Sequence, residues 1–217
     1  RTDHQVDRGG QLRLDQVGLG VADVVLDQER EHTDEGPGGP IVGVASSANP
    51  FGRYFAEILR TEGLNYFTVT DIQNVTPTLL VGYRSVILGE MSLSGAQVTT
   101  LTDWVNGGGR LIAMRPDKQL AGLLGLTDTV ATLAEKYLRI DTSAAPGAGL
   151  VSETIQFHGT ADLYTLSGAT ALATLYSDAT TPTTYPAVTL RSVAGGGYAA
   201  AFTYDLARSV VYTHQGN

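Results

Sequence analysis

The sequence predicts an α/β fold in which a mainly parallel sheet carries helices on both faces. Two observations predict it. Between residues 41 and 124, short apolar runs of strand length alternate with segments whose apolar residues repeat at helical spacing. Glycine, proline and helix-capping residues stand at the boundaries between these segments. Strands joined by helical crossovers pair in parallel, so the alternation indicates one sheet with helices above and below it.

The first strand–helix–strand unit begins at residues 41–46 (IVGVAS), an apolar run that suits a strand buried on both faces. Asn49 and Pro50 then supply a capping residue followed by proline in the first helical turn. A helix is expected from there to Gly63, because the apolar residues between them repeat at helical spacing. Residues 66–70 are expected to form the second strand.

The third and fourth strands are expected at residues 85–90 (SVILGE) and 110–114 (RLIAM). Between them, a helix over residues 94–106 begins with a capping box at Ser94 and ends at three consecutive glycines. Trp104 lies on the apolar stripe of this helix. We therefore expect its indole to be buried against the sheet.

Signals are weaker after this point. A short helix over residues 118–124 is expected to stop at Gly125, and residues 137–140 are expected to form a strand. Near the C-terminus, three more strands are expected, the last two joined as a hairpin, and then a final helix capped by Asp205. These strands cover residues 171–176, 187–193 and 198–204, and the helix covers residues 206–212.

The N-terminal segment has a different composition. Residues 1–35 hold nine acidic residues and four arginines, so most of the net charge of −8 lies there. Residues 36–40 (GPGGP) interrupt any regular element. We therefore interpret residues 1–39 as an acidic tail or linker, with short strands left open as an alternative, and residues 40–217 as the folded domain.

Composition excludes several classes of function. The chain has no cysteine, which removes disulfides, thiolate metal ligands and a cysteine nucleophile. The net charge of −8 and the scattered basic residues argue against nucleic-acid binding, and no apolar run is long enough to span a membrane. No nucleotide motif is complete, and the four histidines are dispersed, so neither a cofactor nor a metal is expected.

The candidate site follows from the parallel sheet, because ligands bind beyond the carboxyl ends of parallel strands. Glu90 and Arg115 would there form a charge pair able to orient a polar ligand. Two structural interpretations stay open: Asn49 serves only as a helix cap, and Arg115 pairs with Asp117. Polar residues at these strand ends make up the full candidate set, which is Ser46, Ser47, Asn49, Glu90, Arg115 and Asp117. His158 with Asp162 is a weaker candidate pair.

The order of these motifs resembles the class I glutamine amidotransferase-like superfamily. The resemblance rests on IVGVASSANPFGRYFAEILRTEGLNYF, on the strand VILGE, on the helix ending WVNGGG, on RLIAMRPD and on AAAFTYDLARS. It covers about residues 40–217 and looks closest to divergent domains of large secreted bacterial proteins, related to trehalose-utilisation-type domains and to the trimerisation domain of β-galactosidases. It implies a flavodoxin-like three-layer sandwich with a C-terminal β-hairpin extension.

Catalytic members of that superfamily carry a cysteine on a sharp turn after a central strand, and a histidine with a glutamate after a late strand. Here the turn reads Arg115-Pro116-Asp117 and the late strand ends at Tyr204-Asp205. Without a thiolate and its base, the resemblance implies the fold and argues against the activity.

We therefore expect a non-catalytic, secreted module, a fragment of a longer chain, that serves domain assembly or small-ligand binding. The expected partners are neighbouring domains of the same polypeptide, a small polar or sugar ligand and, as an open alternative, further copies of the chain. The alternative function is a hydrolase acting on glycosides or amides, with Glu90 or Asp117 as general acid or base and Arg115 assisting. A carbohydrate-binding role would instead require an exposed aromatic platform, for which Trp104 is the one tryptophan.

Overall fold

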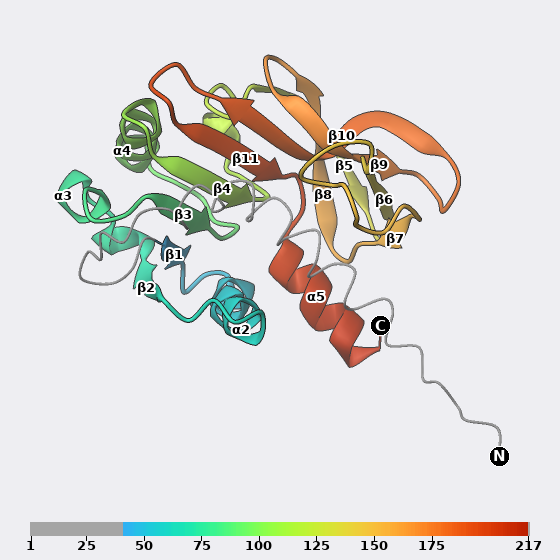
Figure 1. Ribbon diagram of the computed structural model, residues 1–217, viewed down its shortest axis with the longest axis horizontal. Helices are drawn as coiled ribbons and strands as arrows, with labels where there is room; N and C mark the ends of the chain where they lie inside the picture. Colours follow the sequence, from blue (N-terminus) through green and yellow to red (C-terminus); the bar gives the residue numbers. More distant parts are fainter. Residues whose placement is uncertain (1–40, 217) are drawn as a thin grey trace.

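The computed structural model of the protein describes residues 41–216, and its main sheet has nine strands in the order β2-β1-β3-β4-β11-β10-β9-β6-β7 (Figure 1). Parallel pairings join the first five strands of this order. These strands are β1 (Ile41–Ala45), β2 (Phe67–Asp71), β3 (Ser85–Leu88), β4 (Arg110–Met114) and β11 (Tyr198–Phe202). All five were expected, to within a few residues at their ends.

Helices cover both faces of the parallel strands. Side chains of β3 and β4 alternate between two buried clusters: Ile87 and Ile112 lie in one cluster, Val86 and Leu111 in the other. This period of two is the reason that such strands are apolar throughout. The first cluster includes α2 (Tyr54–Thr61) and α5 (Leu206–Gln215), and the second includes α3 (Pro77–Leu80) and α4 (Gly95–Asn106). The result is an α/β sandwich over this part of the sheet.

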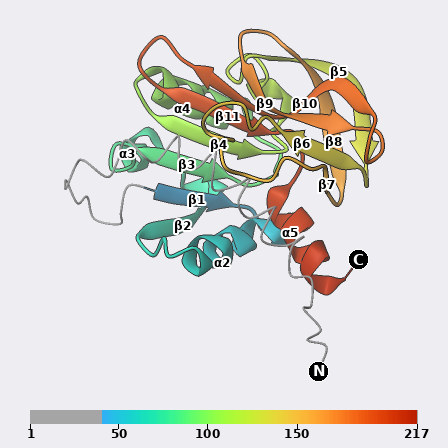
Figure 2. The ribbon, with the colours of Figure 1, turned by 45° about the vertical axis from the view of Figure 1, so that its right-hand side comes forward.

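Antiparallel pairings extend the sheet beyond β11. They add β10 (Pro182–Ser192), β9 (Thr170–Tyr176), β6 (Tyr137–Ile140) and β7 (Ile155–Gln156). A second sheet pairs β5 (Leu126–Ala134) with β8 (Thr160–Leu166) beside this half, on the right in Figures 1 and 2. The β10–β11 hairpin was expected as an extension. It instead lies inside the sheet, because β11 pairs in parallel with β4.

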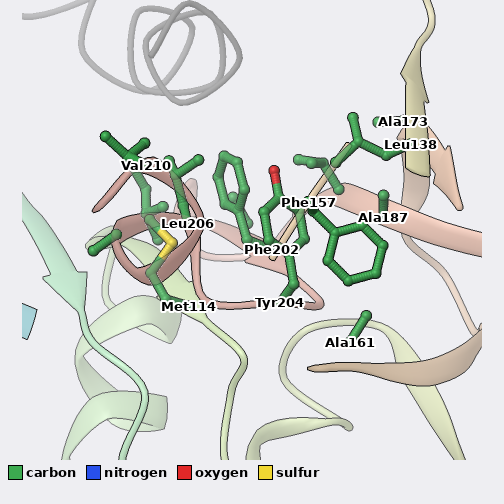
Figure 3. Close-up of a cluster of buried hydrophobic side chains, with 14 of the residues drawn as sticks. Met114, Leu138, Phe157, Ala161, Ala173, Ala187, Phe202, Tyr204, Leu206 and Val210 are labelled. Carbon is green, nitrogen blue, oxygen red and sulfur yellow. The ribbon is translucent and has the colours of Figure 1, made fainter. Parts of the chain in front are cut away.

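The first buried cluster connects the two halves of the molecule. In Figure 3, Tyr204 lies between Phe202 and Phe157, with ring centroids 6.0 Å and 5.3 Å apart respectively. Leu206 and Val210 of α5 and Leu138 of β6 belong to the same cluster. The helix that follows β11 and the antiparallel strands therefore share one core.

Local signals account for the helix starts. The side chain of Asn49 accepts a hydrogen bond from the Phe51 N–H at the start of a 3-10 turn, η2 (Pro50–Arg53), that leads into α2. The capping box of Ser94 and Gln97 is present at α4, and Asp205 caps α5. These caps were expected from residue type alone.

Several expectations were incomplete or wrong. The helix over 118–124 is only a 3-10 turn, η4 (Lys118–Leu120), and residues 121–125 form further turns before β5 begins at Leu126. The short helix α3 and strands β5, β7 and β8 were not predicted, and η3 (Ile72–Asn74) was also missed. The expectation for residues 1–39 lies outside the described residues.

Candidate functional site

A cleft of about 560 Å³ opens beyond the carboxyl ends of β1, β3 and β4. These strands pair in register, so the loops that follow them emerge at one edge of the sheet. Four of the six candidate residues line the cleft: Asn49, Glu90, Arg115 and Asp117. Ser46 and Ser47 are not among its lining residues, and the Ser46 hydroxyl instead accepts the Ala48 N–H.

Arg115 lies at the centre of an ion network. Its Nη1 donates to Oε1 of Glu90 at 2.7 Å and its Nη2 donates to Oδ1 of Asp162 at 3.3 Å. Its Nε also lies 3.2 Å from Oδ2 of Asp162 but is not aligned for a hydrogen bond, so that contact is ionic only. Burial alone would lower the pKa of Arg115, but Asp162 and Glu90 outweigh burial and raise it.

The backbone at Arg115 is strained. Its φ of 33° lies in the left-handed region, which is uncommon for a residue with a side chain. Its N–H donates to the carbonyls of Phe202 at 2.8 Å and Tyr204 at 3.2 Å. These bonds tie the sharp turn after β4 to the end of β11 and hold the guanidinium inside the cleft.

Glu90 is the lining carboxyl whose proton affinity is shifted upward. Burial is the largest cause that raises its pKa; Arg115 lowers it, and the carboxylate of Asp205 raises it further. Its Oε2 is buried and has no hydrogen-bond partner among the described residues. Glu90 therefore binds a proton more readily than an exposed glutamate does, and its Oε2 can accept a further hydrogen bond.

Asn49 and Asp117 mainly build the cleft walls. Asn49 caps η2 and also donates from Nδ2 to the carbonyl of Glu90 and to Oδ2 of Asp205, both at 3.1 Å. Asp117 accepts the N–H of Leu93 at 2.8 Å and that of Gln119 at 2.9 Å. The alternative that Arg115 pairs with Asp117 was therefore wrong, because each has other partners.

Sequence reasoning did not place Asp162 or Arg208 in this cleft, although it named Asp162 as a candidate partner of His158. Asp162 comes from β8, a strand with too little periodicity to be expected, so nothing indicated that it would face Arg115. Arg208 comes from the first turn of α5. A signal for Arg208 did exist, since that helix was expected to start where β11 ends, at the same edge of the sheet.

The candidate pair of His158 and Asp162 was wrong. His158 Nδ1 lies 3.0 Å from Oε2 of Glu135, while Asp162 contacts Arg115. The His158 N–H donates to the Ser209 hydroxyl at 2.9 Å, which joins this buried histidine to α5. The residue is 6% exposed and does not line the cleft.

Trp104 is not an open aromatic platform. Its indole N–H donates to the Leu80 carbonyl at 3.1 Å, and its ring covers Gly109, where a Cβ would come within 2.4 Å of ring atoms. The side chain is partly buried against the second cluster, whereas Leu101 and Val105 of the same helix are fully buried.

Within residues 41–216, no cluster of three or more histidine, aspartate or glutamate side chains could hold a metal ion. In the same range, none of the helices combines the length and the hydrophobicity that a membrane-spanning segment requires.

The fold is similar to that of several solved structures. Exo-β-1,4-mannosidase Op5Man5 from Opitutaceae bacterium strain TAV5 matches with a TM-score of 0.60 and 15% identity, over 90% of this chain and 36% of that chain. A β-galactosidase from Bacillus circulans sp. alkalophilus matches with a TM-score of 0.58 and 13% identity, over 85% and 32%. The mmIFT52 N-terminal domain matches with a TM-score of 0.54 and 15% identity, over 78% and 87%.

At such identities the similarity is one of fold. This chain spans about a third of the length of the two glycosidases. No protein-family model and no curated protein matches the sequence. The presence of β-galactosidases among the similar folds agrees with the relation to β-galactosidase domains that the sequence suggested.

Proposed function

We propose that this chain is a non-catalytic, class I glutamine amidotransferase-like domain of a larger secreted bacterial protein. In this proposal it assembles with neighbouring domains of the same polypeptide and binds a small ligand in the strand-end cleft. The order of its five parallel strands supports the relation, because 2-1-3-4-5 is the flavodoxin-like order when β11 counts as the fifth. The share of the glycosidase chains that it matches supports a role within a longer protein.

One observation carries the non-catalytic part. The strained turn after β4 is where the resemblance places the nucleophile, and it holds Arg115, whose guanidinium is engaged by Glu90 and Asp162. A guanidinium cannot attack a carbonyl carbon, because it stays protonated. The position that would start the amidotransferase reaction instead forms ion pairs with two carboxylates.

The test is a turnover assay. Glutamine should release no more ammonia than it does with a heat-denatured control, since no nucleophile is available. Ammonia release that depends on the folded chain would overturn the proposal. The assembly part is tested separately, by co-purification of residues 40–217 with the remainder of the polypeptide expressed as a second chain.

The alternative is a hydrolase, and one observation favours it. The raised pKa of Glu90 suits a general acid, and Asp162 provides a second carboxylate on the other side of Arg115. Both carboxylates are ion-paired, however, so neither is free to activate water. Hydrolysis of nitrophenyl glycosides that disappears in Glu90→Gln and persists in Glu57→Gln, outside the cleft, would establish the alternative.

A further inference from the structure

We propose that the cleft binds a small hydroxylated carboxylate of the sugar-acid class, with the guanidinium of Arg208 holding its carboxylate group. This inference rests on the proposed function, in which the cleft binds a ligand without transforming it. It adds the charge and the chemical class of that ligand.

Arg208 differs from the other cations that line the cleft. Among residues 41–216, the structure gives its guanidinium no ion pair and no hydrogen bond, and Nε is buried without an acceptor. Arg115 is engaged by two carboxylates, and Lys118 lies 2.9 Å from Asp128. A buried donor without an acceptor in the chain is open to a partner from outside it, since such groups are normally satisfied.

The guanidinium is also held in place. It lies over the ring of Phe51, 4.9 Å from the centroid, and its Cδ is close enough to Gly159 that a Cβ there would come within 2.8 Å. The helix fixes its base, because the Arg208 N–H donates to the capping carboxylate of Asp205. A pre-organised guanidinium loses little freedom on binding and suits the planar, two-oxygen geometry of a carboxylate.

The remaining charges of the cleft favour hydroxyl groups over a second ionic group. The lining acids and bases are equal in number, three of each, so a ligand of high charge would meet repulsion. The carboxylates still have lone pairs to offer: Asp117 holds one N–H on each oxygen, and Oε2 of Glu90 holds none. A ligand with one negative charge and several hydroxyl donors would satisfy both kinds of site.

The size of the cleft agrees with this class. Its volume of about 560 Å³ falls within the range of roughly 300 to 1,000 Å³ that is usual for small-molecule sites. Such a cleft has room for a monosaccharide acid such as glucuronate.

The experiment titrates the full chain separately with sodium glucuronate, glucose, acetate and inorganic phosphate. Isothermal titration calorimetry and amide chemical shifts measure the binding. Glucuronate should bind at least about tenfold more tightly than glucose or acetate, because only it supplies both the charge and the hydroxyls. Arg208→Gln should weaken glucuronate binding about tenfold or more and leave any glucose binding unchanged. Arg208→Lys keeps the positive charge but loses the planar guanidinium. It should bind glucuronate more weakly than the parent protein and more tightly than Arg208→Gln.

A matched control is Arg60→Gln. Arg60 lies over the ring of Phe67 at 5.3 Å in the same kind of contact but does not line the cleft, so glucuronate binding should stay unchanged. Equal affinity for glucuronate and glucose, stronger binding of phosphate, or no binding at all would each overturn the inference. These outcomes are independent of the turnover assays, which test the proposed function by product release.

Discussion

Arg115 is the residue that most affects the distribution of charge in the cleft. Its side chain forms ion pairs with both Glu90 and Asp162, so one positive charge is shared by two carboxylates. Sequence reasoning could place Glu90 beside Arg115, because both follow neighbouring parallel strands. It could not place Asp162, since a contact between β4 and β8 depends on tertiary packing that no local pattern encodes.

Arg115→Met tests this role. Removing the cation leaves two carboxylates without their partner, one of them only 8% exposed, and such a loss costs about 3 kcal/mol of unfolding free energy. Urea unfolding at neutral pH provides the measurement. Lys118→Met is the control, because that pair is more exposed, and it should cost less than about 1 kcal/mol. Equal losses would show that the network contributes no more than a surface pair.

Glu90→Gln tests the shifted carboxyl. Because its pKa is raised in the folded state, Glu90 holds its proton more tightly when folded, so stability contributed by this group falls as pH rises through the folded pKa. The glutamine variant has no such penalty. It should be at least as stable as the parent protein at pH 7, and the difference should shrink as pH falls toward the ordinary value of 4.5. Thermal unfolding of both proteins across this pH range provides the measurement. A glutamine variant that is less stable than the parent protein at pH 7 would contradict the upward shift of the Glu90 pKa.

Helices and strands with local signals, namely caps and apolar runs, were predicted correctly. Asn49, Ser94 and Asp205 were recognisable as caps without any structure, and each begins a helix. The short elements had no such signal. Strand β5 was missed because most of its side chains are exposed or partly buried, which weakens the alternation that marks a strand.

Helix α4 and strand β4 meet at Trp104 and Gly109. Trp104→Ala should lower the unfolding free energy by about 2 to 3 kcal/mol, somewhat below the cost for a fully buried aromatic ring, because the indole is only partly buried. Gly109→Ala should also destabilise, by about 1 to 3 kcal/mol, since its methyl group would collide with the ring.

A double-mutant cycle separates this contact from unrelated effects. With the ring absent, Gly109→Ala should cost clearly less than it does in the parent protein. Strictly additive losses, measured by equilibrium unfolding, would mean that the ring does not limit the size of residue 109. A loss below about 1 kcal/mol for Trp104→Ala would support an exposed role for the tryptophan instead.

Across the two halves of the sheet, both the strands and the pairing of the parallel half were predictable. In the antiparallel half, β6, β9 and β10 were expected as strands, but their place in the sheet was not. Residues 41–124 alternate strand and helix signals. In the antiparallel half, β9, β10 and β11 pair in chain order, and so do β6 and β7. The pairing of β6 with β9, which joins these two groups, is long-range and has no local signal. The hairpin of β10 and β11 was recognised from its glycine turn. Its place between the two halves of the sheet could not be predicted, because no local sequence pattern indicates that β11 also pairs with β4.

Removing residues 1–39 tests the domain boundary. A chain of residues 40–217 should keep its unfolding free energy within about 1 kcal/mol, because the acidic composition of that segment disfavours a place in the core. Limited proteolysis should cut near residues 36–40 and leave a stable fragment. A loss of several kcal/mol, or failure to fold, would make the segment part of the domain.

The position of β11 also governs how the protein can be made. Strand β4 pairs on one side with β3, formed early in the chain, and on the other with β11, which is formed almost last. A growing chain on the ribosome must therefore keep the edge of β4 open until residues 198–202 have emerged. Such an open edge is a template for pairing between molecules. Slow translation of the last third, or a chaperone that shields this edge, should therefore influence the soluble yield more than the stability of the finished protein does.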